Sequence, residues 1–380
     1  MPSTHTYGCI SNSFVGITLL VNLQGCGRPQ IADEQKVDTH VFCCVVTNYK
    51  ESSQLGCHRT TNMYMHIMHH QGKDYSWEKA GNKVRFLIDD KDGSEIRNNS
   101  FYKYYALNKY SVDALTHLYL YATHPCQLND PLDCADELIK FDDIESARAV
   151  LGDLYTGVAE MCNNDKDAVL EFTKVGFRTY YYMKMGIFCL SSNCNDISMW
   201  SSYTEHKGFC VEFDVNSFPY DFWGPFEVNY QKKIEPVSVK RASLPLAALI
   251  QTNIKHDCWQ HEHEYRLLIQ CPEGDYMEPY GFKSELFKSR MPDLRDRKLK
   301  YPLRCIKSVY LGMKFFNGIH AVMTDYEDEY IASNEYQNQI LSFLALSKIP
   351  VYVLVNKGLM IERHQIEIIQ IRNGAYQINF

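Results

Sequence analysis

The chain lacks the sequence features that mark membrane and secreted proteins. No apolar run approaches the ~20 residues that a membrane-spanning helix requires. Residues 14–23, "FVGITLLVNL", are too short to span a bilayer, and no Lys or Arg precedes them as in a signal peptide. We therefore expect a soluble, cytoplasmic protein without a membrane partner.

Signs of disulfides, bound metal and a nucleic-acid surface are also weak. The 14 cysteines form no C-x-x-C pair, which favours reduced thiols. The histidines of "MYMHIMHH" at 63–70 have helical spacing but match no zinc pattern, so an exposed, poorly ordered cluster is expected there and no metal site. A net charge of −7 argues against a nucleic-acid partner. The basic residues in 283–300 are expected to form a solvated charged segment.

The chain contains no standard catalytic or cofactor fingerprint. There is no G-x-G-x-x-G, P-loop, G-x-S-x-G or H-E-x-x-H motif. The "HEHEY" at 261–265 is not the zinc-protease pattern, because histidines two apart on a helix diverge and cannot share a metal. Function must therefore be inferred from less specific patterns.

The patterning of the chain changes near residue 98. Residues 1–98 show strand-like runs only at 39–49 and 83–90, and we expect a loosely organised N-terminal extension. Residues 99–380 alternate between strand and helix patterns without a repeat, which predicts one α+β domain with a mixed or antiparallel sheet flanked by helices. Strands are expected at 101–107, 119–123, 186–192, 207–215, 264–271, 305–312, 350–356 and 365–371, and helices at 108–119, 142–162, 165–185, 193–206, 244–256 and 334–349.

The stretch "HDCWQHEHEYRLLIQ" at 256–270 carries the strongest candidate for a site. As a strand it would place Glu262, Glu264 and Arg266 on one face, with the two carboxylates about 7 Å apart. Such a pair can divide acid–base and electrostatic roles. The alternative is a surface ion pair between Glu264 and Arg266 on an edge strand, which would contribute little.

Three further patterns yield candidates, each with a structural alternative. Asn129 and Asp130, followed by a proline, form a rigid turn that could present both side chains or be a plain turn. Trp200 and Tyr203 are three apart on a helix face and could stack a planar ring or belong to the core. Ser191 ends a strand. The nearby cysteines are expected to be buried thiols rather than nucleophiles: Cys189, Cys194 and Cys210.

Several of these motifs occur together in an order that resembles the bacterial domain-of-unknown-function family numbered 2971. The resemblance covers about residues 100–315, and we expect it to reach the C-terminus. It implies an α+β fold but no settled activity. The positions that match the family pattern are Tyr102, Lys103, Tyr104, Asn129, Asp130, Pro131, Leu190, Ser191, Met199, Trp200, Tyr203, Lys207, Gly208, Phe213, Asp214, Glu262, Glu264, Tyr265 and Arg266.

The order of parts is also similar to that of NAD-dependent ADP-ribosyltransferases and NAD hydrolases. In that analogy Tyr102 or Lys103 on the first strand, Ser191 on a middle strand and Glu264 on a late strand would be the matching positions. The hypothesis makes Glu264, Glu262 and Ser191 catalytic and NAD the candidate substrate. The expected ligand-binding residues are Tyr102, Lys103, Asn129, Asp130, Trp200, Tyr203 and Arg266.

Two alternatives remain open. One is a non-catalytic ligand-sensing or interaction module in phage defence or stress response, with Trp200, Tyr203 and Arg266 binding a partner. The other is a metal-dependent nuclease that uses carboxylates as hard oxygen ligands. Against the nuclease, no lysine accompanies the Glu-x-Glu in sequence. Its ligands would be Asp130, Asp133, Glu262 and Glu264.

The enzyme hypothesis predicts that the candidate residues meet in one cleft. It also predicts that Glu264→Gln abolishes activity with little effect on stability, while Glu262→Gln does less, because Glu264 lies deeper toward the apolar part of the strand.

The change in patterning near residue 98 predicts a protease-resistant core. Limited proteolysis should leave a stable fragment that begins between about residues 60 and 100. N-terminal sequencing of that fragment gives the boundary, and a full-length chain that is resistant throughout would contradict the prediction.

Overall fold

The fold is built around a mixed ten-stranded sheet in which all neighbours pair antiparallel except β17 and β19, which are parallel. The computed structural model describes residues 66–80, 83–271, 275–278, 294–316, 330–358 and 360–380, all within one unit, Thr39–Phe380. The strand order is β18 (Tyr330–Ile331), β21 (Ala375–Asn379), β20 (Met360–Arg372), β19 (Val351–Lys357), β17 (Ile306–Leu311), β8 (Phe209–Phe213), β4 (Phe101–Tyr105), β7 (Met185–Ser191), β13 (Glu264–Gln270) and β9 (Trp223–Glu227). The predicted α+β class is confirmed.

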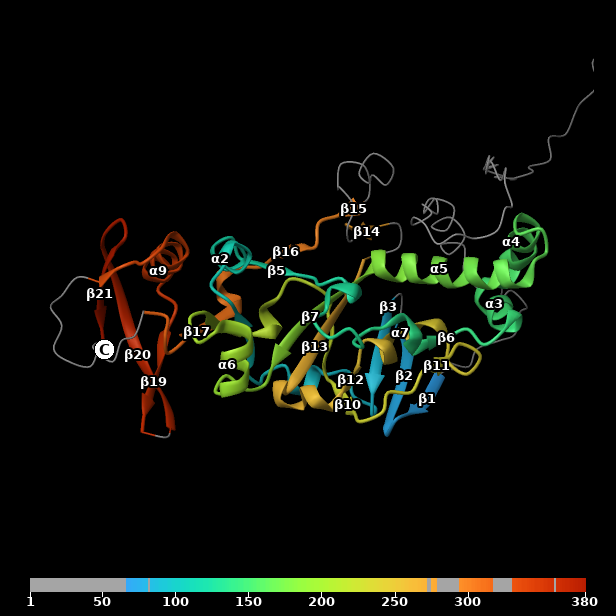
Figure 1. Ribbon diagram of the computed structural model, residues 1–380, viewed down its shortest axis with the longest axis horizontal. Helices are drawn as coiled ribbons and strands as arrows, with labels where there is room; N and C mark the ends of the chain where they lie inside the picture. Colours follow the sequence, from blue (N-terminus) through green and yellow to red (C-terminus); the bar gives the residue numbers. More distant parts are fainter. Residues whose placement is uncertain (1–65, 81–82, 272–274, 279–293, 317–329, 359) are drawn as a thin grey trace, which may run out of the picture. The chain divides into compact units, whose positions relative to one another are not determined.

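Helices cover both faces of this sheet (Figure 1). The helices of the described residues are α2 (Lys109–Thr116), α3 (Ile144–Leu151), α4 (Tyr155–Met161), α5 (Lys166–Lys184), α6 (Ile197–Thr204), α7 (Leu244–Gln251) and α9 (Glu335–Ser347), and of these α3 and α4 pack against α5 rather than on the sheet. Side chains cap α2 and α6, since Asn108 accepts from the backbone of α2 and Asp196 from that of α6. The single helix expected at 142–162 is wrong, since Gly152 ends α3 with φ at +54° and α4 follows a 3-10 turn.

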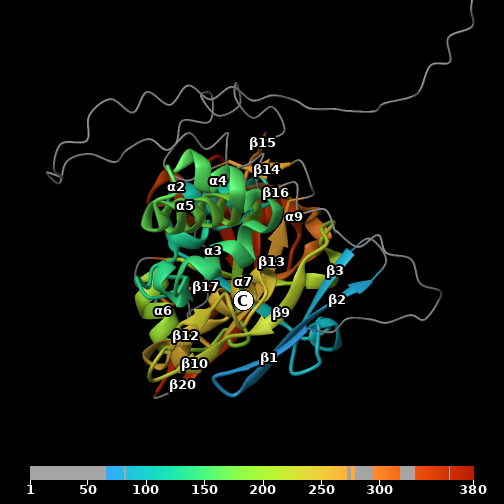
Figure 2. The ribbon, with the colours of Figure 1, turned by 90° about the vertical axis from the view of Figure 1, so that its right-hand side faces the viewer.

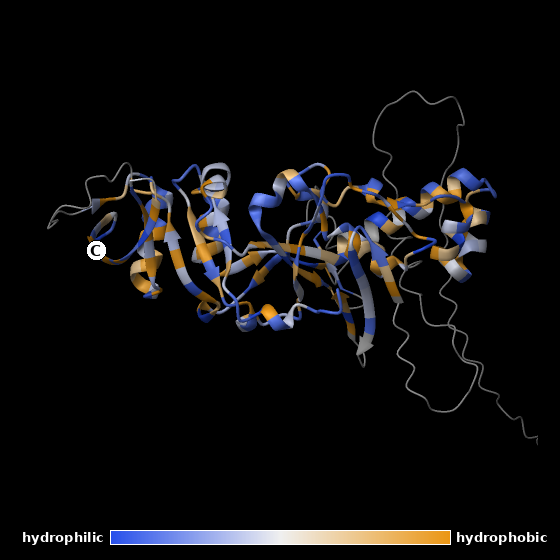
Figure 3. Ribbon diagram, turned by 90° about the horizontal axis from the view of Figure 1, so that it is seen from below, coloured by the Kyte–Doolittle hydropathy of each residue, from blue (hydrophilic) through white to orange (hydrophobic). Residues whose placement is uncertain are grey.

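Alternation along the strands separates the two apolar cores. Phe188 and Leu267 face the core that holds α2 and α9, while Ile187 and Leu268 face the core that holds α5 and α7. Helix α6 packs against β4 on the same side as α5 and α7. Figure 3 shows hydrophobic residues, in orange, on strands and helices alike.

Shorter elements complete the fold. A three-stranded sheet consists of β1 (His66–His70), β2 (Lys73–Ala80) and β3 (Lys83–Ile88). Strand pairs are β10 (Asn229–Gln231) with β12 (Ile254–His256), β11 (Val237–Ser238) with β6 (Ile139–Lys140), β14 (Tyr276–Met277) with β15 (Leu294–Arg295), and β16 (Lys298–Lys300) with β5 (Tyr119–Tyr121). The 3-10 turns are η1 (Ser94–Ile96), η2 (Pro125–Gln127), η3 (Asp136–Leu138), η4 (Gly152–Leu154), η5 (Val215–Ser217), η6 (Asp257–Glu262) and η7 (Leu303–Cys305).

The division expected at residue 98 is not where the fold divides. Strands β1–β3 lie next to β9 and α7 (Figure 2). Tyr75 on β2 is fully buried in the core that contains Phe177 and Leu246. The Trp223 indole also donates to the Val84 carbonyl at 2.8 Å. Residues 66–98 therefore belong to the folded unit, while the strand expected at 39–49 lies outside the described residues.

Two local predictions also need correction. The histidine cluster is not helical where it is described, because His69 and His70 lie on β1 and bond to different partners, Asp74 and the Glu235 carbonyl. Residues 261–263 are not part of a strand. They end η6 in a left-handed turn at His263, with φ at +46°, and β13 begins only at Glu264.

Removing the Tyr75 hydroxyl should destabilise the fold. It donates to Asn253 Oδ1 at 2.9 Å and accepts from Asn229 Nδ2 at 3.1 Å inside the core. Tyr75→Phe leaves Asn253 Oδ1 without that donor, so the free energy of unfolding should fall by about 1–3 kcal/mol. Denaturant unfolding measures this. Tyr110→Phe is the control, because Tyr110 is 79% exposed, and an equal effect of both changes would contradict the prediction.

Candidate functional site

A cavity of about 220 Å³ lies where β4 and β7 separate. β4 pairs with β8 through five residues but with β7 only through Tyr102 and Ser191, so the two strands diverge beyond that pair. Cavities commonly form where neighbouring elements diverge in this way. The lining residues are Tyr102, Lys103, Tyr104, Thr123, Gln127, Leu128, Asn129, Asp133, Cys189, Leu190, Ser191, Met199, Tyr203, Lys255, Glu262 and Glu264.

Three of the candidate residues form one row across the sheet. Tyr102 on β4 lies opposite Ser191 on β7, and Ser191 lies opposite Glu264 on β13. Directly opposite residues in antiparallel strands project from the same face. The three positions suggested by the similarity to ADP-ribosyltransferases therefore share one face and line one cavity.

Beside this row lies a buried network of three carboxylates and two cations. Lys255 Nζ is 2.5 Å from Glu262 Oε2 and 3.0 Å from Glu264 Oε2. Arg266 Nε donates to Glu264 Oε1 at 2.8 Å, and its terminal nitrogens bond both Asp133 oxygens at 2.8 and 2.5 Å. Every side chain is at most 5% exposed. With all five ionised, the network carries one negative charge in excess.

The two glutamates differ in acidity although they lie side by side. Burial alone would raise the pKa of Glu264, but the charges of Arg266 and Lys255 outweigh burial and lower it. For Glu262, burial and the neighbouring Glu264 outweigh Lys255, and the pKa is raised. Glu264 is therefore a fixed anion, whereas Glu262 is suited to exchange a proton. Tyr203 donates its hydroxyl to Glu262 Oε1 at 2.5 Å.

The backbone around Glu262 is fixed by contacts with β7 and β10. Ser191 Oγ donates to the Glu262 carbonyl at 2.7 Å, and the Ser192 amide donates to the His263 carbonyl at 3.1 Å. The Glu264 amide donates to the Tyr230 hydroxyl at 3.0 Å. The left-handed turn at His263 thus brings Glu262 and Glu264 onto the same cation.

Two other cavity residues have altered proton affinities. Lys103 is partly buried, donates to the Cys189 carbonyl at 3.1 Å and lies over the Phe188 ring, 4.8 Å from its centroid. Burial lowers the pKa of Lys103. Burial also raises the pKa of the Cys189 thiol. The thiol is therefore protonated at neutral pH, which agrees with the expected inert role.

The structure separates the candidate residues into two groups. Those that line the cavity are Tyr102, Lys103, Asn129, Ser191, Tyr203, Glu262 and Glu264. Those that do not are Asp130, Trp200 and Arg266. Asn129 joins the site by donating to the Tyr203 hydroxyl at 2.9 Å.

The three outlying residues have supporting positions. Trp200 is fully buried, and its indole donates to the Cys194 carbonyl at 2.7 Å, so the expected Trp–Tyr stacking surface does not form. Asp130 is buried and accepts from the Leu132 amide at 2.9 Å, as a turn residue does. Arg266 lies behind Glu264, and the alternative of a surface ion pair is wrong because both groups are buried.

Sequence reasoning missed two members of the network, Lys255 as a partner of the glutamates and Asp133 as the partner of Arg266. No lysine is adjacent to the Glu-x-Glu in the sequence, but in the folded structure Lys255 bonds both glutamates. Lys255 lies on β12, and only the fold of η6 brings it back beside them. The stretch "NIKH" carries no local signal for this pairing, since Lys255 stands between Ile254 and His256 in a polar context.

The carboxylates do not form a metal site in this arrangement. Within the described part of the chain, no group of three or more His, Cys, Asp or Glu residues is placed to hold a metal ion. Lys255 and Arg266 occupy the positions between the oxygens of Asp133, Glu262 and Glu264. Three of the four ligands expected for a nuclease are thus paired with cations, and the fourth, Asp130, does not line the cavity.

Comparison with known proteins supports the family resemblance over part of the chain. Residues 199–267 match the family model described as "Protein of unknown function (DUF2971)". This segment runs from α6 to β13 and contains Tyr203, Lys255, Glu262, Glu264 and Arg266. Neither the curated proteins nor the solved structures gave a match. No helix in the described residues has the length and apolarity to cross a bilayer.

Removing Arg266 should strongly destabilise the fold. Arg266→Met leaves Asp133 and Glu264 buried with only Lys255 nearby, and breaking a buried pair in this way costs about 3–5 kcal/mol. Chemical denaturation gives the loss. Arg148→Met is the control, because the Arg148–Glu145 pair is 53% and 58% exposed and should change little. Adding Asp133→Asn to Arg266→Met should recover part of the loss.

The loss should also depend on pH. The folded-state pKa of Glu264 lies below its unfolded value, so its contribution is fully present above the unfolded value of about 4.3 and disappears as pH falls through the folded pKa. The difference between wild type and Arg266→Met should therefore narrow below about pH 4. If Arg266→Met lowers the free energy of unfolding by less than about 1 kcal/mol at every pH, the structural role assigned to Arg266 is contradicted.

Proposed function

We propose that this chain is an enzyme that cleaves the N-glycosidic bond of NAD, either hydrolysing it or transferring the ADP-ribosyl group. The proposal rests on one observation: Tyr102, Ser191 and Glu264 form a cross-strand row at a cavity that also contains a second glutamate of raised pKa. The expected setting, a bacterial cytoplasm, is part of the same proposal, whereas a role in phage defence or stress response belongs to the binding-module alternative.

The chemistry follows from the different states of the two glutamates. As the bond from the ribose anomeric carbon to the nicotinamide nitrogen breaks, the bonding electron pair goes to the nicotinamide, and positive charge develops on the ribose. The network's excess negative charge, with Glu264 at the cavity, would stabilise that charge. Water or another acceptor adds to the anomeric carbon and gives its proton to Glu262, which Tyr203 orients at 2.5 Å.

The size and lining of the cavity favour one ring rather than a whole dinucleotide. A volume of about 220 Å³ is below the roughly 300–1,000 Å³ of sites that enclose a drug-sized ligand. Tyr102 and Tyr203 supply aromatic faces for a flat ring such as nicotinamide. The remainder of NAD would then extend out of the cavity, and Lys103 is the cation that β4 contributes to the lining.

A binding module without catalysis is the second candidate. It is favoured by the pairing of Glu264, whose two oxygens are both engaged by Arg266 and Lys255. A carboxylate held in this way can fix the shape of a pocket without acting on its occupant. Binding of NAD without release of nicotinamide would identify this alternative.

Substitution of the two glutamates tests the enzyme proposal. Glu262→Gln should lower nicotinamide release from NAD by about 10²–10⁴-fold, because it removes the proton acceptor. Glu264→Gln should also abolish activity, but the expectation of unchanged stability needs correction, since its buried carboxylate accepts from Arg266 and Lys255. Glu212→Gln is the control, because this half-buried glutamate on β8 lies outside the cavity.

The pH profile separates a proton acceptor from a structural residue. If Glu262 acts as the base, kcat/KM should fall on the acid side as Glu262 becomes protonated, at a pH above the ordinary glutamate pKa. The remaining activity of Glu262→Gln should lack that limb. No consumption of NAD by the wild type at millimolar concentration, with protein and nucleic acid offered as acceptors, would remove the enzyme proposal.

A further inference from the structure

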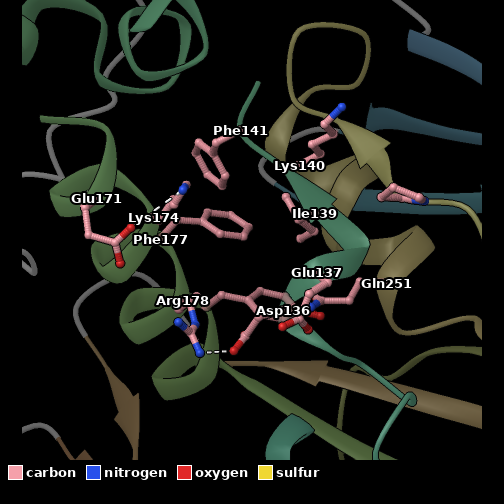
Figure 4. Close-up of a pocket in the computed structure, with 12 residues that line it drawn as sticks. Asp136, Glu137, Ile139, Lys140, Phe141, Glu171, Lys174, Phe177, Arg178 and Gln251 are labelled. Atoms are coloured by element: carbon pink, nitrogen blue, oxygen red, sulfur yellow. Dashed lines mark hydrogen bonds and ion pairs between the residues drawn. The ribbon is translucent and has the colours of Figure 1, made fainter. Parts of the chain in front are cut away.

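A second cavity, of about 500 Å³, lies between α5 and the segment that carries η3 and β6 (Figure 4). It shares no lining residue with the cavity at Glu264. Its volume falls within the roughly 300–1,000 Å³ of small-molecule sites. The lining residues are Asp136, Glu137, Ile139, Lys140, Phe141, Glu171, Lys174, Phe177, Arg178, Tyr181, Pro236 and Gln251.

Aromatic rings form one wall of this cavity. Phe177 and Tyr181, one helical turn apart on α5, are stacked with centroids 5.8 Å apart and ring planes 7° apart. Phe141 faces Phe177 from the opposite segment, with centroids 6.0 Å apart. Ile139 extends the apolar surface (Figure 4). Such a wall suits a flat ring that can stack on it.

Gln251 supplies an unsatisfied acceptor at the base of the cavity. Its side chain extends from the end of α7 toward Asp136 and Glu137 (Figure 4) and is 2% exposed. Gln251 Nε2 donates to the Cys134 and Ala135 carbonyls, at 3.0 and 2.9 Å, which fixes the orientation of the amide. Gln251 Oε1 has no hydrogen-bond partner in the described part of the chain. A buried acceptor in this state favours a ligand that brings a donor.

The charged residues of the lining also favour a ligand that donates hydrogen bonds. Arg178 is paired with Asp136, Lys174 with Glu171 and Lys140 with Asp142, so the cations are engaged. Glu137 makes no ion pair with any described residue. The lining therefore offers a ligand hydrogen-bond acceptors rather than hydrogen-bond donors.

We propose that this cavity binds a flat nitrogen heterocycle that carries an amino group, with the ring against Phe141 and Phe177 and the amino group donating to Gln251 Oε1. The aromatic wall selects the ring, and the unsatisfied amide oxygen selects the donor. An anionic ligand would find no unpaired cation in the described lining. The amino-purine of adenosine has this chemistry and lacks a charge, which makes it the simplest probe.

The same segment connects this cavity to the glutamate site. Gln251 holds the Cys134 and Ala135 carbonyls, next to Asp133. Arg266 donates to the Thr252 carbonyl at 2.9 Å and to Asp133. A ligand that bonds Gln251 therefore contacts the residue that fixes the backbone beside the Arg266 ion pairs.

Titration calorimetry of the full chain with two nucleosides tests the site. Adenosine should bind, and purine riboside, which lacks the amino group, should bind about 10-fold more weakly. In Gln251→Leu the affinity for adenosine should fall to that for purine riboside, and the preference should disappear. Equal affinity of the wild type for both nucleosides, or no binding of adenosine at 10 mM, would overturn the proposal.

Aromatic variants test the location without relying on Gln251, which also ties down the backbone. Phe177→Leu should weaken both nucleosides, whereas Phe172→Leu, on the same helix but outside the lining, should weaken neither. Tyr203→Leu removes an aromatic face from the other cavity without removing an ion pair and should leave adenosine binding intact, so that this site and the NAD proposal can fail separately. Loss of adenosine binding in Tyr203→Leu but not in Phe177→Leu would place the ligand in the other cavity and overturn the proposal.

Discussion

The bidentate pairing of Arg266 with Asp133 and Glu264 is the interaction on which the centre of the fold depends. A guanidinium that is 1% exposed has no water to solvate it, so its donors must be met by protein oxygens in fixed positions. Those oxygens come from β13 and from the loop before η3. A buried ion pair contributes little net stability against apolar residues, but it tolerates few alternative geometries. Its main effect is therefore to fix that loop against the sheet.

This constraint also positions the charge of the site. Because Arg266 and Lys255 keep Glu264 ionised, the nearby Glu262 carries a second negative charge that the cations do not fully offset. Like charges held close together in a buried site move the two pKa values apart. Burial raises the pKa of both glutamates, and the difference arises because Arg266 and Lys255 together outweigh burial at Glu264, whereas Lys255 does not outweigh it at Glu262.

The sequence predicts the elements well where local signals decide them. Helices lie within the ranges 108–119 and 193–206 that the sequence predicts, and the alternation of apolar residues places β13 correctly from Glu264 onward. The strand prediction fails at Glu262, because His263 adopts a left-handed conformation that interrupts the strand. A left-handed conformation at a non-glycine residue is set by tertiary contacts and cannot be read from the local pattern. The prediction for Trp200 fails because a helical pair looks the same whether it faces a core or a cavity.

Lys255 and Asp133 show why the rest of the site is hidden in the sequence. The glutamates that bond Lys255 lie 7 and 9 positions away, and the arginine that bonds Asp133 lies 133 positions away. No local pattern specifies pairing at these separations. The sequence does show that Arg266 lies inside an apolar strand, where a buried arginine needs a carboxylate partner. The same requirement applies to Lys255 once the fold buries it. Each such residue predicts that a partner exists, and the fold decides which one it is. The segment from Gln251 to Lys255 carries several buried polar groups in succession. Its first residue lines the cavity beside α5 and its last lines the cavity at Glu264, so one short segment contributes to both cavities.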